Sequence, residues 1–232
     1  MVNHPLFKEG KITVQDIASQ MVTEVTSPEE NSLVIDLCSA PGGKTAHLAA
    51  WMNNTGTIYA CDIHPHKIKL MEKNFKRLGV ENVKLQLIDA REVYKVVKEE
   101  SFDYVLADAP CSGLGVMSHK VDLKAKLVIS FLSFALALVS LFCVGELKQN
   151  SYQAIEDIIK LQREILVASY PLIKKGGYLT VSTCTINKSE NEEQIAFLLK
   201  QFPDLQVEYQ NTILPFEYNT DGFFICKLKK GE

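Results

Sequence analysis

The sequence DLCSAPGGKT at Asp36–Thr45 joins a short apolar run, residues 32–37, to a predicted helix over residues 44–52. A short apolar run that ends in a glycine-rich turn is typical of a buried parallel strand. The two glycines of the turn carry no side chains, so the backbone can approach a ligand closely, and the helix begins with positive dipole character. The stretch does not read Gly-x-x-x-x-Gly-Lys-[Ser/Thr], which disfavours a phosphate-binding P-loop. We interpret it as a loop for a nucleotide-type cofactor; the alternative is a tight turn without a ligand.

Strands and helices alternate along the rest of the chain. Further strands are predicted at residues 57–62, 83–88, 102–107, 178–182, 205–209 and 223–228, and helices at 14–25, 65–78, 152–173 and 190–202. This alternation indicates an α/β fold, with a mostly parallel seven-stranded sheet and helices on both faces. Because only a loop separates the last two strands, we expect them to pair antiparallel at one edge. Gly79 is expected to cap the helix at 65–78.

The composition is that of an ordinary globular chain. Of the 232 residues, 47% are hydrophobic, and the formal net charge is −3. This charge gives no general attraction to nucleic acid, so any such contact must come from a local patch. The six cysteines show no metal-ligand spacing and no Cys-x-x-Cys, which disfavours a structural zinc site and a disulfide scaffold and suits a reducing, cytoplasmic location. Residues 1–5 lack the basic-then-apolar pattern of a signal peptide.

Acidic residues end four of the predicted strands: Asp36, Asp62, Asp89 and Asp108. In an open α/β sheet, ligands bind outside the carboxyl ends of the strands, so these carboxylates are candidates for one site. Asp62 is placed to accept hydrogen bonds from ribose hydroxyls, or else to cap the following helix. Asp89 is placed to accept from an adenine amino group, with the same alternative of capping.

Two cysteines also follow predicted strands. Cys111 lies in Asp108-Ala109-Pro110-Cys111-Ser112-Gly113, and Cys184 lies in Ser182-Thr183-Cys184-Thr185, where we expect it to be partly exposed. Because a thiolate is a strong nucleophile, two strand-end thiols beside a cofactor loop indicate covalent chemistry on a bound group. The other cysteines are interpreted as small buried hydrophobic residues: Cys38, Cys61, Cys143 and Cys226. The histidines show no metal spacing and receive no catalytic role: His4, His47, His64, His66 and His119.

With these motifs the chain resembles the S-adenosylmethionine-dependent RNA cytosine-5 methyltransferases, in particular the bacterial ribosomal RNA small-subunit methyltransferase B type, also called the Sun or Fmu type. The resemblance covers most of the chain. It rests on residues 14–20 (VQDIASQ), the cofactor loop, the two cysteine motifs, Glu190-Asn191-Glu192 and Asp221-Gly222-Phe223-Phe224. Two cysteines in this arrangement are highly specific among methyltransferases.

The resemblance implies a Rossmann-like class I methyltransferase fold that binds S-adenosylmethionine. The loop residues would line the cofactor: Cys38, Ser39, Ala40, Pro41, Gly42, Gly43 and Lys44. Asp62 would hold the ribose, Asp89 would lie near the adenine, and Asp108 would lie beside both the cofactor and the target base.

The resemblance also implies separate roles for the two thiols. Cys184 would attack carbon 6 of a cytosine, which makes carbon 5 nucleophilic enough to take the methyl group. Cys111 would assist product release, by proton transfer. DNA cytosine-5 methyltransferases use the Pro-Cys thiol as nucleophile, so the presence of Cys184 favours RNA, with 16S ribosomal RNA as the expected substrate. The target base must be flipped or unpaired, because a base inside a helix cannot be reached.

One segment departs from the family pattern. Residues 127–145 carry no charge and have the length of a membrane-spanning helix, within an unusual apolar insertion at 125–148. Val121-Asp122 stands where the family has Pro-Asp. A single span there would place the two halves of the sheet on opposite sides of a membrane, so we expect no stable membrane association. The remaining interpretations are a packed hairpin or helix, an oligomer contact, or an anomaly that disables the protein.

We therefore expect one methyltransferase catalytic domain at residues 1–232, with a lead-in at 1–31 and without the N-terminal RNA-binding domain that the family type usually carries. RNA is the expected partner. Two alternatives remain: a small-molecule methyltransferase, which has no need for two strand-end thiols, and a catalytically impaired module that binds RNA or a protein partner.

Overall fold

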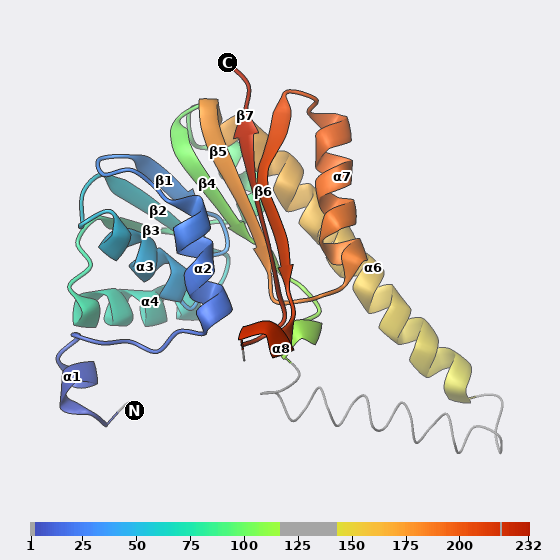
Figure 1. The fold of residues 1–232 in the computed structure, drawn as a ribbon, viewed down its shortest axis with the longest axis horizontal. Helices are drawn as coiled ribbons and strands as arrows, with labels where there is room; N and C mark the ends of the chain where they lie inside the picture. Colours follow the sequence, from blue (N-terminus) through green and yellow to red (C-terminus); the bar gives the residue numbers. More distant parts are fainter. Residues whose placement is uncertain (1–2, 117–142, 219) are drawn as a thin grey trace.

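The computed structural model describes residues 3–116, 143–218 and 220–232. Seven strands lie within these ranges: β1 (Leu33–Asp36), β2 (Thr57–Asp62), β3 (Val83–Leu87), β4 (Phe102–Asp108), β5 (Ile173–Thr183), β6 (Leu205–Ile213) and β7 (Phe223–Lys230). They form one sheet in the order β3-β2-β1-β4-β5-β7-β6 (Figure 1). The strands from β1 to β5 pair in parallel, whereas β7 is antiparallel to both β5 and β6. The predicted mostly parallel sheet and the antiparallel pair at one edge are confirmed.

Helices cover both faces of this sheet. In Figure 1, α2 (Ile17–Thr26), α3 (Gly43–Trp51) and α4 (Pro65–Leu78) lie on the left of the central strands, and α6 (Cys143–Ser169) and α7 (Glu192–Gln201) lie on the right. The shorter elements are α1 (Pro5–Lys8), η1 (Ala90–Lys95), η2 (Leu114–Val116), η3 (Tyr170–Leu172), η4 (Lys188–Glu190) and α8 (Pro215–Tyr218).

Alternate residues of the central strands supply two separate cores. In β1, Val34 packs in the cluster that contains α2 and α3, whereas its neighbour Ile35 packs in the cluster that contains α6 and α7. In β4, Leu106 and Val105 divide between the clusters in the same way. Because side chains of a strand alternate between faces, apolar residues at every position indicate a strand covered on both sides.

Helix boundaries follow local chemistry. Asp16 caps α2, since its side chain accepts a hydrogen bond from the Ala18 amide at 3.0 Å. Gly79 ends α4 with a φ of 68°, in the left-handed region that favours glycine, as predicted.

Two predicted helices have different bounds in the structure. The helix expected at 152–173 begins at Cys143 and ends at Ser169, followed by the turn η3 that contains Pro171. Proline has no amide hydrogen to continue a helix, and Ile173 already pairs with Phe102 in the sheet. The helix expected at 190–202 is divided, because Glu190 belongs to η4 and α7 begins at Glu192.

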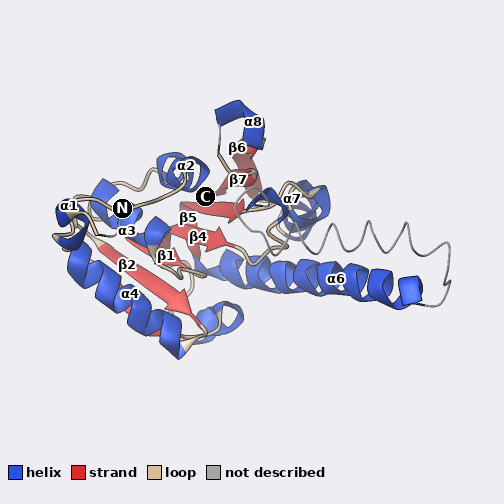
Figure 2. Ribbon diagram, turned by 90° about the horizontal axis from the view of Figure 1, so that it is seen from below, coloured by secondary structure: helices blue, strands red, loops and turns tan. Residues whose placement is uncertain are grey.

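The predicted apolar insertion separates two strands that lie side by side. Asp108 at the end of β4 pairs with Ser182 near the end of β5, so both flanks of the insertion enter the same sheet. The part of the apolar stretch at residues 127–142 lies outside the described residues, as does Val121-Asp122. α6 follows it and extends beyond the sheet (Figure 2). Among the residues that the structure describes, no helix has the length and apolarity needed to cross a membrane.

Candidate active site

A cleft of about 510 Å³ opens at the carboxyl ends of the parallel strands. This volume lies within the range of roughly 300–1,000 Å³ that is usual for small-ligand sites. Seven of the predicted site residues line it: Cys38, Ala40, Asp62, Asp89, Asp108, Cys111 and Cys184. Apolar side chains that include Ile63, Leu161 and Ile165 form part of its wall. The sheet therefore brings together residues that are up to 146 positions apart, from Cys38 to Cys184.

The two predicted reactive thiols are neighbours. The Sγ atoms of Cys111 and Cys184 lie 3.1 Å apart, and both residues are half-buried. Cys111 lies in the loop after β4, and Cys184 directly follows β5. The hydrogen bond to Cys184 and burial raise the pKa of the Cys111 thiol far above its ordinary value. Either sulfur could donate in this contact, and the raised pKa of Cys111 favours Cys111 as the thiol that holds the proton.

A partly buried ion pair lies beside these thiols. Lys44 Nζ contacts Asp108 Oδ2 at 2.7 Å, and the Ser182 hydroxyl donates to Asp108 Oδ1 at 2.7 Å. Burial works to lower the pKa of Lys44, but the charge of Asp108 outweighs it and the pKa is raised. The charge of a Cys184 thiolate also raises it. Lys44 is thus a stable cation close enough to favour ionised Cys184.

Asp36, with 0% of its surface exposed, interacts electrostatically with both members of this ion pair. Burial raises the pKa of its carboxyl to about 7, although the Thr45 hydroxyl donates a hydrogen bond to Oδ2 at 2.7 Å. The sequence marked Asp36 as a strand-end carboxylate but gave it no role in the site. Its contact with Thr45 ties the end of β1 to the start of α3, which carries Lys44.

Asp89 makes the capping contact that the sequence left as an alternative, whereas Asp62 does not cap α4, whose N-cap is His64, but accepts a hydrogen bond in the turn before it. Asp62 Oδ1 accepts from the His64 amide at 2.8 Å, and Lys67 Nζ lies 3.5 Å from Oδ2. Asp89 caps η1 and pairs with Arg91, which lowers the pKa of the Asp89 carboxyl mainly through their side-chain hydrogen bonds. Both carboxylates still line the cleft. Asp62 keeps acceptor capacity beyond these contacts, whereas each Asp89 oxygen already accepts two hydrogen bonds from Arg91, so a ligand at Asp89 must share or replace one of them. The turn contact and ligand binding are therefore compatible at Asp62.

The remaining loop residues support the site from outside the cleft lining. The Ser39 hydroxyl donates to the Cys61 carbonyl at 2.8 Å, which joins the loop to β2. Gly42 has a φ of 95°, and a Cβ there would lie 2.9 Å from the Phe75 ring, so backbone conformation and helix packing both require glycine. Pro41 and Gly43 complete the turn into α3 without lining the cleft.

Burial dominates the environment of the other described cysteines. Burial raises the pKa of Cys61 and of Cys226 to about 12, and burial raises that of Cys38 well above its usual range. Cys38 differs from the expectation of a fully buried residue, since it is half-buried and lines the cleft. His119 and the side chain of Cys143 lie outside the described residues. Within the described ranges, no group of three His, Cys, Asp or Glu residues could hold a metal ion.

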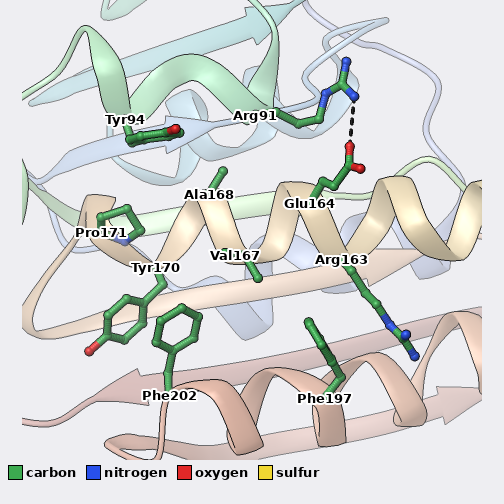
Figure 3. Close-up of a pocket in the computed structure, with 10 residues that line it drawn as sticks. All are labelled: Arg91, Tyr94, Arg163, Glu164, Val167, Ala168, Tyr170, Pro171, Phe197 and Phe202. Atoms are coloured by element: carbon green, nitrogen blue, oxygen red, sulfur yellow. Dashed lines mark hydrogen bonds and ion pairs between the residues drawn. The ribbon is translucent and has the colours of Figure 1, made fainter.

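A larger cavity of about 730 Å³ lies elsewhere, along α6 between η1 and α7. Figure 3 shows Tyr94 on one side of α6 and Phe197 and Phe202 on the other. It contains neither thiol and none of the strand-end carboxylates. The smaller cleft is the better candidate, because the reactive groups converge there.

Glu190 is a site residue that sequence analysis missed. Its carboxylate accepts hydrogen bonds from the amide and the hydroxyl of Ser112, each at 2.7 Å, and so contacts the Cys111 loop. The motif Glu190-Asn191-Glu192 was part of the resemblance, but nothing in the spacing shows that it reaches a loop 78 positions away.

Comparison with known proteins identifies the same family that the motifs indicated. The family described as "16S rRNA methyltransferase RsmB/F" matches residues 23–128 and 146–229. A Bacillus subtilis (strain 168) protein named "Probable ribosomal RNA small subunit methyltransferase B" is 34% identical, over 97% of this chain and 49% of that protein. The "tRNA (cytosine(72)-C(5))-methyltransferase" of Pyrococcus horikoshii is 31% identical, over 97% of this chain and 54% of that protein.

A solved structure supports both fold and cofactor class. The crystal structure of NSun6 from Pyrococcus horikoshii with SFG, an analogue of S-adenosylmethionine, has a TM-score of 0.79 at 30% identity, over 100% of this chain and 56% of that one. The Rossmann-like methyltransferase fold is confirmed. The chain spans about half the length of the curated relatives it matches.

Proposed function

Since the chain belongs to the RsmB/F family of 16S rRNA methyltransferases, we propose that it methylates carbon 5 of a cytosine in RNA through a covalent Cys184 adduct. The observation that carries this proposal is the pair of thiols 3.1 Å apart at the strand ends, beside the Lys44–Asp108 ion pair. A small-molecule methyltransferase has no use for a second thiol at that position. The proposal treats residues 1–232 as the catalytic domain and RNA in the cytoplasm as its partner, with 16S ribosomal RNA as substrate.

The cleft fits S-adenosylmethionine, the cofactor of this family. Asp62 supplies a carboxylate fixed by the His64 amide and is suited to ribose hydroxyls, and Asp89 lies on the same cleft to accept from an adenine amino group. Ile63 and Leu161 offer apolar surface for the adenine ring. Bound there, S-adenosylmethionine supplies the methyl group.

Cys184 acts as the nucleophile in this proposal. Its sulfur is near the Lys44 cation, which favours the thiolate, and it lies 3.1 Å from the Cys111 sulfur, which we assign as the donor because the pKa of Cys111 is raised. Attack forms a bond from sulfur to carbon 6 of the cytosine, and the electron pair of the 5,6 double bond moves so that carbon 5 becomes nucleophilic. The Asp108 carboxylate is held by Lys44 and Ser182. In this proposal it lies beside the target cytosine and orients it.

Cys111 acts after methylation. Carbon 5 then carries both a hydrogen and the new methyl group, so the proton at carbon 5 must leave before the bond from carbon 6 to sulfur can break. The carbon 5 proton passes to a water molecule, its electron pair restores the 5,6 double bond, and the electron pair of the bond from carbon 6 to sulfur leaves with Cys184 as a thiolate. The position of Cys111, 3.1 Å from that sulfur, supports its role as the thiol that protonates the leaving thiolate.

The test is methyl transfer from S-adenosylmethionine with a labelled methyl group to 16S ribosomal RNA and to 30S particles, followed by digestion to nucleosides. We expect the label in 5-methylcytidine, and none when Cys184→Ser replaces the parent protein. Label in a different nucleoside would contradict the proposed position of methylation, and label transferred to small molecules alone would favour a different substrate class.

A further inference from the structure

We propose that Glu190 is the positioning residue that fixes the Cys111 thiol against Cys184, and that its carboxylate thereby controls product release. The position of the thiols follows from the geometry alone, whereas the effect on release rests on the proposed function. Glu190 touches neither sulfur. It acts on the residue that follows Cys111 in the chain.

The contacts of Glu190 show how this works. With 1% of its surface exposed, the residue places a carboxylate in the protein interior at the junction of the two thiol loops. Oε2 accepts from the Ser112 amide at 2.7 Å, while Oε1 accepts from the Ser112 hydroxyl at 2.7 Å and from the Asn187 side-chain amide at 2.9 Å. Hydrogen bonds to a charged acceptor are about twice as strong as neutral ones. Ser112 is therefore held at both its backbone and its side chain.

The Cys184 loop is held from the same short segment. Asn191, which follows Glu190, accepts from the Thr183 hydroxyl at 2.5 Å and donates to the Thr185 carbonyl at 2.9 Å. Thr183 and Thr185 flank Cys184 on either side. The Ser112 and Thr185 hydroxyls also lie 3.2 Å apart, so the residues that follow the two cysteines contact each other directly.

A separate backbone contact joins the two thiol loops without the help of Glu190. The Gly115 amide donates to the Cys184 carbonyl at 3.0 Å, and a Cβ at Gly115 would lie 1.8 Å from the Gly222 carbonyl oxygen. We expect this contact to keep the two loops together when Glu190 is replaced. Loss of the carboxylate should then change the position of Cys111 without separating the loops or unfolding the sheet.

Only a carboxylate satisfies all the donors around this position. Glutamine has one oxygen acceptor, so in Glu190→Gln its amide nitrogen must face either the Ser112 amide or the pair of donors at Oε1. One of these contacts becomes donor against donor. Glu192→Gln is the matched control, because Glu192 lies two positions away and accepts from the Thr212 hydroxyl at 3.0 Å rather than from the Cys111 loop.

The first test measures the distance between the thiols without RNA. Diamide, a diazene oxidant, takes two electrons and two protons from a pair of thiols and leaves a disulfide, and its rate reports how often two sulfurs meet. We expect the disulfide between Cys111 and Cys184, identified by peptide mass spectrometry, to form at least tenfold more slowly in Glu190→Gln than in the parent protein or in Glu192→Gln. An unchanged rate would overturn the proposal.

The second test measures release. With RNA and S-adenosylmethionine, Glu190→Gln should accumulate a covalent protein–RNA adduct severalfold above Glu192→Gln and approach Cys111→Ala, while both glutamine variants unfold at similar denaturant concentrations. If Cys111→Ala gives no adduct, the proposed function fails, and the diamide rate still decides the role of Glu190. Should Glu190→Gln not fold, Ser112→Ala removes the hydroxyl contact alone and should slow disulfide formation in the same direction; no slowing there would refute the proposal.

Discussion

Replacement of Asp62 by asparagine tests the cofactor side of the cleft. Asp62 is buried at the end of β2, and its Oδ1 accepts from the His64 amide at 2.8 Å. The asparagine side-chain oxygen can keep that contact, so Asp62→Asn retains the turn before α4 and removes the negative charge and one acceptor. A hydrogen bond to a charged group contributes about 1.5–3 kcal/mol. At about 1.4 kcal/mol per factor of ten, the affinity for S-adenosylmethionine should fall roughly 10- to 150-fold.

Isothermal titration calorimetry measures this affinity directly, and Asp16→Asn is the matched control. Asp16 accepts from the Ala18 amide at 3.0 Å and does not line the cleft, so its replacement removes a similar charge that also accepts from the amide two positions later. We expect the control to bind S-adenosylmethionine as the parent does. Equal affinity in Asp62→Asn and the parent, with both folded, would refute the assignment of Asp62 to the cofactor.

Two further predictions concern ionisation. Burial raises the pKa of Asp36 to about 7, so the folded state holds the proton of this carboxyl more tightly than the unfolded state does. The resulting stabilisation is complete below about pH 4 and is lost as the pH rises towards 7. In urea denaturation, Asp36→Asn should therefore flatten the dependence of the unfolding free energy on pH between these values. An unchanged slope would contradict the burial of an ionisable Asp36. Because the pKa of Cys111 is raised, iodoacetamide at neutral pH should label Cys184 before Cys111, as read by peptide mass spectrometry, and faster labelling of Cys111 would show that the proton sits on the other sulfur.

The sequence predicted most of the fold because its signals are local. The apolar run before Gly42 and the alternation after it placed β1, β2 and α4 close to their observed bounds, and Gly79 marked the end of α4. Boundaries were wrong where tertiary contacts decide them. Ile173 enters the sheet because it pairs with Phe102, and no local pattern shows that partner.

The candidate site was predictable only in part for the same reason. Strand-end positions identified Asp62, Asp108 and both thiols, since the carboxyl ends of parallel strands meet at one edge. Contacts between residues far apart in the chain could not be predicted from the sequence. The pairing of Lys44 with Asp108 spans 64 positions, and that of Ser112 with Glu190 spans 78, so neither follows from spacing along the chain.

The most direct test of the central claim separates the roles of the two thiols on a denaturing gel. The protein is incubated with its RNA substrate and S-adenosylmethionine, and covalent protein–RNA complexes are detected. Attack precedes methylation and release follows it, so Cys111→Ala should accumulate a stable adduct, whereas Cys184→Ser should form none, because a serine hydroxyl is far less ionised than a thiol at neutral pH. An adduct in Cys184→Ser and none in Cys111→Ala would reverse the two roles, and no adduct in either variant, with S-adenosylmethionine bound normally, would contradict covalent catalysis by this chain.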